Sequence, residues 1–264
     1  MSNIESQKQQ AIELHSAQAD MFAARYAEAA QDVYKDCFLY SRHRLDALLR
    51  RYLPERGDGL RLLDVGCGTG HHLARLRQRG YEIAGIDGSE EMLRYARMNN
   101  PGADLRLADV DRLPFPDGCF DLILCIEVLR YLPDASGCIG EMARVLKPGG
   151  ICLVTAAPRF SLNAYWVVNR VVQLIPVGNL VRLKQFFTTS VQLRRQFLEA
   201  GFQTVNVHGV YLGPINWVQR LAPRLLPRLL RAWEPHDATL ADHALWREFS
   251  NMFLVHAVRG ERGA

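Results

Sequence analysis

Short apolar segments alternate with amphipathic segments between residues 60 and 157. This alternation is the pattern of repeated βαβ units in a parallel sheet. Strongly apolar strands, such as the one near 120–126, indicate that the sheet is covered on both faces. The expected strands lie near 60–65, 82–87, 104–108, 120–126 and 150–157, and the expected helices lie near 70–79, 89–99 and 136–146.

The segments on either side of this alternation follow other patterns. Residues 11–53 have helical periodicity without a strand signal, and they predict two helices, near 11–31 and 38–52. Lys147-Pro148-Gly149-Gly150 is typical of a helix end followed by a turn into the next strand. Beyond residue 187 we expect a helix capped by Thr188 or Ser190 and ending at Gly201, a strand near 202–212 and a last strand from Phe249 to Arg259.

Two unusually apolar insertions interrupt this second half of the chain. Residues 159–187 carry valines and aromatic residues, and their charged residues are all arginine or lysine. Residues 214–248 interleave leucines and tryptophans with Arg220, Arg224, Arg228 and Arg231. The first insertion leaves the carboxyl end of the fifth strand and the second leaves the carboxyl end of the sixth. Because ligands of open α/β sheets bind at that edge, we expect the insertions to form a cap over the binding site.

The run from Leu62 to Gly70 is the most specific local feature. An apolar strand reaches Asp64, and glycines at 66, 68 and 70 then turn the chain tightly into a helix. Such a turn lets the main chain approach a ligand closely and points N–H groups at it. The dinucleotide fingerprint has its third small residue where this chain has His71. The spacing therefore argues against a pyrophosphate and favours a cofactor without one.

Charge is unevenly distributed along the chain. The formal net charge is +4, but residues 151–233 contain ten Lys or Arg and one acid, Glu199, so this segment is +9 and the remainder is −5. Segregation of this kind indicates a partner rather than a requirement of the fold. No apolar run reaches the ~18–20 residues of a membrane span, and residues 1–10 lack the apolar core of a signal peptide. The six cysteines lack metal-ligand spacing, so we expect reduced thiols and no metal.

Further motifs extend the glycine run into a larger pattern. Gly85–Ser89 ends the second strand, Ala108–Asp111 follows the third, and Phe120–Ile123 and Val145–Gly150 complete the series. Over residues 60–157 the chain resembles the class I S-adenosylmethionine-dependent methyltransferases, in the branch with small-molecule, quinone and lipid acceptors. The resemblance implies S-adenosylmethionine as cofactor and a Rossmann-like α/β fold, with a seven-stranded, mostly parallel sheet and an antiparallel last strand. Residues 1–55 would be an N-terminal helical lid, and residues 56–264 the methyltransferase domain with its cap.

The resemblance also assigns residues to a cofactor site. It places Asp87 on the ribose hydroxyls, Asp109 on the adenine amino group and Met92 against the adenine. Gly66 and Gly68 would approach the methionine moiety. The backbone near Ile126 would line the sulfonium side, and Tyr26 would be the lid contact. The expected cofactor-binding residues are Asp64, Gly66, Cys67, Gly68, Asp87, Gly88, Met92, Asp109, Val110, Ile126 and Tyr26.

Several of these residues have a purely structural alternative. Met92 is equally consistent with a core residue, and Asp64 with a cap of the glycine turn that does not touch ligand. Asp111 is better interpreted as a helix cap than as a ligand contact. His71 and His72 open the helix after the glycine run and are interpreted as partly solvated residues rather than ligands.

One motif departs from the family pattern. Members commonly have Glu-Val-Leu-x-His after the fourth strand, whereas this chain has Glu127-Val128-Leu129-Arg130-Tyr131. The easiest general base is therefore missing, and Arg130 and Tyr131 become the candidate catalytic residues. A phenol beside an arginine can have a lowered pKa, which would let Tyr131 steer or deprotonate the acceptor. A tyrosine at such a position more often serves only in packing.

The cap suggests the class of acceptor. Apolar helix faces rimmed by arginine suit an interfacial helix on anionic lipid. We therefore expect a cytoplasmic methyltransferase that acts on an apolar small molecule or a lipid-like acceptor, such as a quinone precursor or a polyprenyl-linked or other lipid intermediate. Peripheral contact with the inner membrane face is compatible with such an acceptor. The alternatives are a cap that only packs on the core, a homodimer interface, a water-soluble metabolite or natural product as acceptor, and a non-catalytic S-adenosylmethionine-binding protein. Nucleic acid is disfavoured, because no binding module is recognisable.

Overall fold

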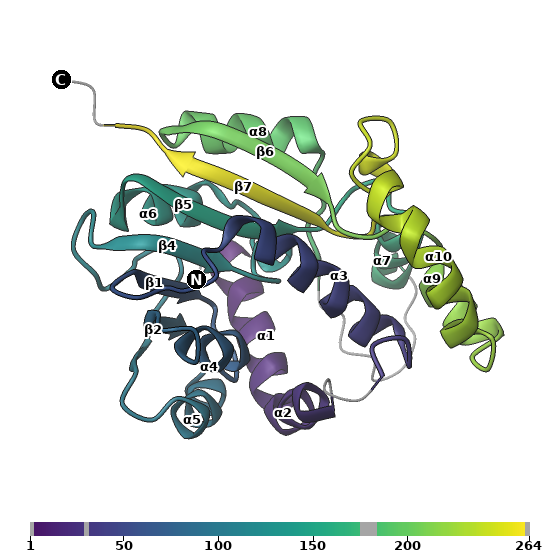
Figure 1. Ribbon diagram of the computed structural model, residues 1–264, viewed down its shortest axis with the longest axis horizontal. Coiled ribbons are helices and arrows are strands. Elements are labelled where there is room, and N and C mark those ends of the chain that lie inside the picture. The colour runs from purple at the N-terminus through teal and green to yellow at the C-terminus, as the bar shows by residue number, and fades with distance from the viewer. Residues whose placement is uncertain (1–2, 29–31, 175–183, 262–264) are drawn as a thin grey trace.

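The computed structural model describes residues 3–28, 32–174 and 184–261 and contains one seven-stranded sheet (Figure 1). The strand order is β3-β2-β1-β4-β5-β7-β6, and β7 runs antiparallel to both of its neighbours. The predicted Rossmann-like sheet with an antiparallel last strand is confirmed. The strands are β1 (Arg61–Val65), β2 (Glu82–Asp87), β3 (Asp104–Leu107), β4 (Phe120–Cys125), β5 (Leu146–Ala156), β6 (Phe202–Gly209) and β7 (Phe253–Arg259).

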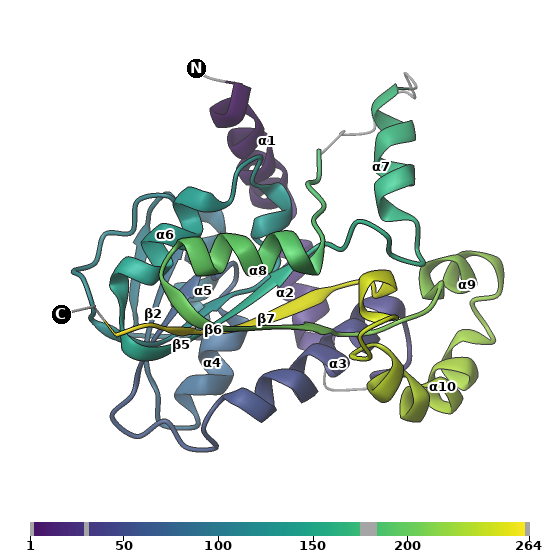
Figure 2. The same ribbon diagram turned by 90° about the horizontal axis from the view of Figure 1, so that it is seen from above.

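Helices cover both faces of the sheet (Figure 2). Helices α6 and α8 lie on one face, and α3 and α4 lie on the other. The helices within this layered body are α3 (Cys37–Tyr52), α4 (His71–Arg77), α5 (Glu90–Asn99), α6 (Ser136–Val145) and α8 (Ser190–Glu199). The helices outside it are α1 (Asn3–Ala17), α2 (Ala19–Glu28), α7 (Tyr165–Leu174), α9 (Ile215–Leu221) and α10 (Leu226–Leu240), and short 3₁₀ turns occupy Leu129–Tyr131 and Arg247–Phe249.

Each face of the sheet has its own core. Successive side chains of a strand point to opposite faces, so Leu63 of β1 packs in the core under α6 and α8, whereas Leu62 packs in the core under α3 and α4. Both side chains are fully buried. This two-sided burial explains why the strands read as continuous apolar runs rather than as alternating ones.

The boundaries differ from the sequence expectations in several places. Strand β6 ends at Gly209 rather than near 212, and β7 begins at Phe253 rather than at Phe249. The first helix predicted near 11–31 is two helices, α1 and α2, and α1 already begins at Asn3. The cap of α8 is Thr189, which forms a capping box with Gln192, rather than Thr188 or Ser190. Strand β5 begins at Leu146, which pairs with Phe120, and a register shift follows before the next pairs. The predicted turn at 147–150 is therefore a bulge inside the strand.

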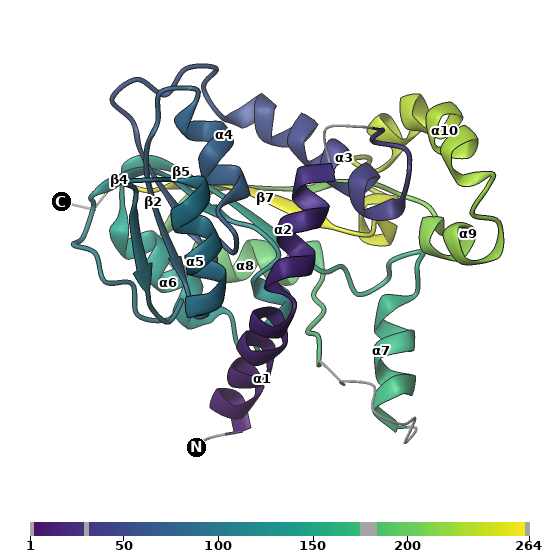
Figure 3. The ribbon, with the colours of Figure 1, turned by 90° about the horizontal axis from the view of Figure 1, so that it is seen from below.

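The two insertions lie at one end of the molecule. Helix α7 of the first insertion projects on the same side of the sheet as α1, as Figures 2 and 3 both show. Residues 175–183 of this insertion lie outside the described part of the structure. Helices α9 and α10 of the second insertion lie next to α3 (Figure 1).

A buried carboxylate ties α10 to the rest of the fold. Asp237 of α10 is fully buried and accepts hydrogen bonds from the Tyr40 hydroxyl, at 2.5 Å, and from the Leu212 backbone N–H, at 2.6 Å. The Arg44 guanidinium lies 3.5 Å away. Burial raises the pKa of Asp237 to about 6, against the opposing effect of these donors. Helix α10 is thus joined to α3 and to the segment after β6 through one side chain.

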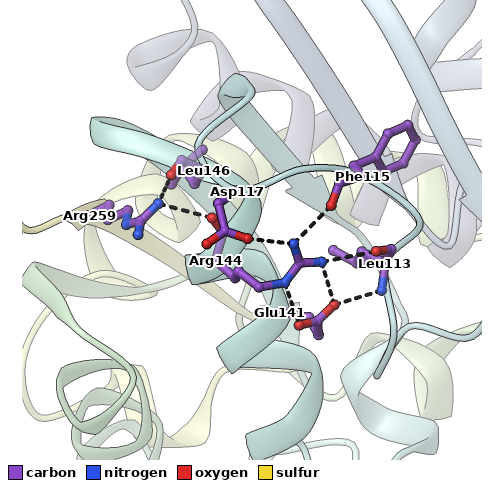
Figure 4. A network of polar contacts seen from close by, with 7 residues as sticks. All are labelled: Leu113, Phe115, Asp117, Glu141, Arg144, Leu146 and Arg259. Atoms are coloured by element: carbon purple, nitrogen blue, oxygen red, sulfur yellow. Dashed lines mark hydrogen bonds and ion pairs between the residues drawn. The ribbon is translucent and has the colours of Figure 1, made fainter.

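Arg144 of α6 fixes the loop that leads into β4 (Figure 4). Its guanidinium donates to the carbonyls of Leu113 and Phe115 and to the carboxylates of Asp117 and Glu141 at 2.7–2.9 Å. Hydrogen bonding to Glu141 and Asp117 raises the pKa of Arg144 further above its usual range. The planar fork of arginine supplies all of these donors at once, so lysine could not replace it here.

Candidate functional site

A cavity of about 810 Å³ lies at the carboxyl ends of the central parallel strands. Segments that follow β1, β2, β3 and β4 line one side of it, and α1, α3 and the two insertions supply the rest. We call this the cofactor cavity. The expected site residues that line it are Asp64, Gly66, Cys67, Gly68, Asp87, Gly88, Met92, Asp109, Val110, Ile126, Arg130 and Tyr131. Motifs separated in sequence by more than 60 residues are therefore brought together at one sheet edge.

The glycine turn after β1 needs its glycines. Gly66, Gly68 and Gly70 all have positive φ angles, of 75°, 52° and 73°, which other residues rarely adopt. At Gly66 a Cβ atom would lie 2.3 Å from Cγ2 of Val128, so alanine would also collide there. At Gly68 a Cβ would meet no described atom within 4 Å, because this position faces the open cavity. The turn thus presents bare backbone to whatever fills the cavity.

Asp87 at the end of β2 connects two parts of the site. One of its carboxylate oxygens accepts a hydrogen bond from the Gly68 N–H at 2.8 Å, and the other accepts from the Ser89 N–H at 2.9 Å. Burial raises the pKa of Asp87, while these backbone donors oppose the rise. Each carboxylate oxygen has a further lone pair. Asp87 can therefore hold the glycine turn and still accept hydrogen bonds from a ligand.

Asp64 is a buried acid that faces the cavity with a free acceptor. It is 1% exposed, and its Oδ1 atom has no hydrogen-bond partner among the described residues. Burial raises the pKa of Asp64 to about 7; the nearby Asp87 adds to the rise, and Arg42 of α3 opposes it. An unpaired buried acceptor of this kind is costly unless a ligand cation or donor completes it. Asp64 therefore suits contact with a positively charged group of a ligand.

Helix α1 covers the side of the cavity that Gly88 and Asp109 line. The Lys8 Nζ atom lies 3.2 Å from Asp109 and also pairs with Asp111, and Ile12 packs so close to Gly88 that a Cβ there would lie 2.7 Å from its Cδ1 atom. Asp111 was expected to cap a helix, but in the structure its carboxylate pairs with Lys8 instead. Ser16 hydrogen-bonds the N-cap Ser89 of α5, Oγ to Oγ at 2.6 Å. The expected lid contact, Tyr26, is in α2, and its side chain lies outside the described part of the chain.

Arg130 and Tyr131 stand on the 3₁₀ turn after β4. Arg130 pairs with Glu127 and donates to Oε1 of Gln185 at 3.1 Å. Glu127 has a φ of 64°, a strained conformation for a residue with a side chain, of the sort that concentrates at functional sites. Burial raises the pKa of Tyr131 in spite of Arg130, so the expected lowering is wrong. Tyr131 remains protonated near neutral pH and can donate a hydrogen bond.

Several cavity residues were not anticipated from the sequence. Lys8 and His15 come from α1, and His15 packs edge-on against Tyr131 with ring centroids 4.8 Å apart. His71 and His72, interpreted from the sequence as partly solvated residues of the helix after the glycine run, are half-buried and line the cavity, and His72 is 3.2 Å from the Arg42 guanidinium. The insertions contribute Tyr165 of α7 and Asn216, Gln219 and Arg220 of α9. These four residues of the insertions belong to no sequence motif. Only the expectation that both insertions cover the binding edge of the sheet indicated that α7 and α9 would line the cavity.

Two absences concern the part of the chain that the structure describes. Within residues 3–28, 32–174 and 184–261, no three His, Cys, Asp or Glu side chains are grouped as metal ligands. Over the same ranges, none of the helices combines the length and the apolarity that crossing a bilayer requires.

Comparison with known proteins finds similarity to methyltransferases. A family model described as a methyltransferase domain matches residues 63–154. The ubiquinone biosynthesis O-methyltransferase of Thiobacillus denitrificans is 30% identical over 189 residues, which cover 68% of this chain and 81% of that protein. All of the motifs that line the parallel-strand side of the cofactor cavity fall within or next to the matched segment.

Solved structures share the fold at low identity. A SAM-dependent methyltransferase from Thermotoga maritima superposes with a TM-score of 0.62 at 17% identity, over 94% of this chain and 98% of that one. Magnesium protoporphyrin IX methyltransferase from Synechocystis, solved with bound SAH, has a TM-score of 0.56 at 18% identity, over 84% and 83% of the two chains.

Proposed function

Because this chain belongs to the class I S-adenosylmethionine-dependent methyltransferases, we propose that it methylates an apolar, lipid-like acceptor. Quinone precursors and polyprenyl-linked intermediates are examples of this class. S-adenosylmethionine is the methyl donor, and its sulfonium group supplies an already activated methyl. The protein therefore has to bind the donor, exclude water and align an acceptor atom with the methyl group.

The residues of the cofactor cavity suit these tasks. Asp87 accepts hydrogen bonds from the ribose hydroxyls, and Asp109 accepts one from the adenine amino group in place of Lys8. Met92, which is 5% exposed, packs against the adenine. Asp64 faces the ammonium of the methionine moiety, and the Gly66–Gly68 backbone lies against that moiety. The orphaned Asp64 oxygen and the space beside Gly68 support this placement.

Arg130 and Tyr131 act on the acceptor in this proposal. Tyr131 keeps its proton and orients the acceptor by donating a hydrogen bond, rather than serving as the general base. Arg130, held by Glu127, stabilises negative charge on an acceptor oxygen. Both side chains line the cofactor cavity next to the residues assigned to the donor.

One observation carries the choice of a lipid-like acceptor. Helix α7 contributes its first residue, Tyr165, to the cavity and α9 contributes one face, and both helices expose large apolar side chains. Trp166, Val171 and Leu221 are 37%, 44% and 82% exposed, and exposed arginines lie on the same helices. Large exposed apolar side chains next to arginines are typical of a helix that binds a membrane surface. Two helices that border the cavity thus have the character of membrane-facing elements.

Methyl transfer from labelled S-adenosylmethionine tests the acceptor class. We expect the protein, incubated with methyl-labelled S-adenosylmethionine and a lysate of its source cell, to place label in the organic phase after extraction. Lysate incubated with the labelled donor but without the protein gives the background. Label confined to the aqueous phase would contradict a lipid-like acceptor and favour a water-soluble metabolite instead.

Binding to vesicles tests the membrane contact. We expect sedimentation with phosphatidylglycerol vesicles but not with phosphatidylcholine vesicles, and loss of binding as the Debye length shrinks from about 10 Å at 0.1 M salt to about 3 Å at 1 M. Charge reversal in Arg224→Glu should weaken binding, because each basic residue at an anionic surface contributes ~1 kcal/mol. Arg194→Glu on α8 is the matched control. Equal binding to both vesicle types would overturn the proposal.

A further inference from the structure

A second cavity, of about 590 Å³, lies between α9, α10 and the segment that leads into α7. We call it the apolar groove. Its walls include Ile215 and Val218 of α9, Leu229 and Trp233 of α10, and Leu162 and Trp246 from the neighbouring segments. The only side-chain hydrogen-bond donors among these six are the indole N–H groups of Trp233 and Trp246, and the Trp233 N–H is directed to the Leu212 carbonyl at 3.1 Å. Ordered water requires polar partners, so the groove suits a hydrocarbon occupant.

Helix α9 is the wall between the apolar groove and the cofactor cavity. Ile215 and Val218 line the groove, whereas Asn216, Gln219 and Arg220 line the cofactor cavity. The spacings of three and four residues put each set on its own face of the helix. The segment before α9 divides in the same way, because Tyr211 borders the cofactor cavity and Leu212 borders the groove. The two cavities are therefore separated by one helix, about 10 Å thick.

The rim of the groove is exposed and basic. Leu229 and Trp246 are 50% and 46% exposed, so the groove reaches the surface. Arg224 and Arg228 are exposed beside it, and Arg220 is exposed on α9 while also bordering the cofactor cavity. An amphiphile with an acidic or polar head complements this arrangement: the chain enters the apolar groove, and the head passes Arg220 toward the methyl group.

We propose that the apolar groove binds the hydrocarbon chain of the methyl acceptor, whose head group reacts in the cofactor cavity on the other side of α9. This inference rests on the proposed function and specifies it: the acceptor is an amphiphile with a hydrocarbon chain. Because the cofactor cavity lies across a single helix from the groove, we assign the groove to the acceptor itself rather than to a bulk membrane lipid.

Brominated fatty acids provide the test, because bromine quenches tryptophan fluorescence on contact and Trp233 and Trp246 line the groove. We expect 12-bromododecanoate to quench the protein and unbrominated dodecanoate to reverse the quenching in competition. Affinity should rise about fourfold for each methylene from octanoate to dodecanoate, as expected for burial of the added group.

Two variants narrow the groove from opposite walls. Val218→Phe and Leu229→Phe should each weaken dodecanoate binding about tenfold or more and raise the KM for the organic-phase acceptor. Affinity for S-adenosylmethionine should be unchanged, which also shows that the variants fold. The control is Leu221→Phe, one turn along α9 at a residue that lines neither cavity.

Several outcomes would overturn the inference. These are an affinity that does not depend on chain length, binding that is unchanged in both groove variants, and a dimer in sedimentation that is lost in Val218→Phe without any fatty-acid binding. The last result would assign the groove to a second copy of the chain. Failure of the proposed function itself is separate and visible as methyl label in the aqueous phase alone.

Discussion

Replacing Asp87 with alanine is expected to weaken S-adenosylmethionine binding by about tenfold or more. A hydrogen bond to a charged group contributes ~1.5–3 kcal/mol, and tenfold corresponds to ~1.4 kcal/mol. The variant would lose the proposed hydrogen bonds from the ribose hydroxyls to Asp87. It would also lose the bond from the Gly68 N–H to Asp87, which holds the glycine turn in place. Isothermal titration calorimetry of the purified variant measures the change directly.

Two further variants serve as controls for the measurement on Asp87→Ala. Glu82→Ala removes a largely exposed acid from the other end of the same strand, β2, and should leave the affinity unchanged. Asp87→Asn keeps an acceptor but not the charge, and its affinity should fall between those of the wild type and the alanine variant. An unchanged affinity in Asp87→Ala would overturn the assignment of Asp87 to the ribose.

Affinity for S-adenosylmethionine is expected to fall by up to about tenfold per pH unit as the pH drops below 7. The cause is Asp64, whose pKa burial raises to about 7 in the free protein. The ammonium of the donor favours the ionised carboxylate, so the pKa of Asp64 is lower in the complex than in the free protein. At a pH between these two pKa values, binding of the donor releases a proton from Asp64, so a lower pH weakens binding. Above pH 7 the carboxylate is already ionised, so this contribution to the pH dependence ends.

Calorimetry at several pH values, in buffers of different ionisation enthalpy, measures both the affinity and the number of protons released. Asp64→Asn should bind more weakly at pH 8 and should lose this pH dependence, because its side chain does not titrate. This control matters because burial also raises the pKa of Asp87. The same slope in Asp64→Asn as in the wild type would exclude Asp64 as its origin.

Most of the layered fold was predictable, because strands buried on both faces leave a clear apolar run. The strand around 120–126 is an example: Ile123 and Leu124 are both fully buried, on opposite faces. The glycine turn was predictable because it depends on local backbone geometry, and positive φ angles at Gly66, Gly68 and Gly70 confirm it. Local constraints of this kind can be identified from the sequence alone.

Other features depend on contacts that no local pattern encodes. Lys8 lies in a polar segment, and its position over the cavity depends on Asp109 and Asp111, about one hundred residues away. The pKa of Tyr131 was misjudged because the neighbouring arginine is visible in the sequence whereas the burial that outweighs it is not. Thr189 rather than Thr188 or Ser190 caps α8, since all three hydroxyls suit a cap and only the chain path decides.

The hydrogen bond between Tyr40 and Asp237 joins residues 197 positions apart. Deleting the insertion that carries Asp237 would leave the Tyr40 hydroxyl and the Leu212 N–H buried without their acceptor, at a cost of ~1–3 kcal/mol for each. The second insertion therefore cannot be exchanged without changing residues outside it. A chimera that carries another protein's acceptor cap must therefore also carry substitutions on the face of α3 that contacts the cap.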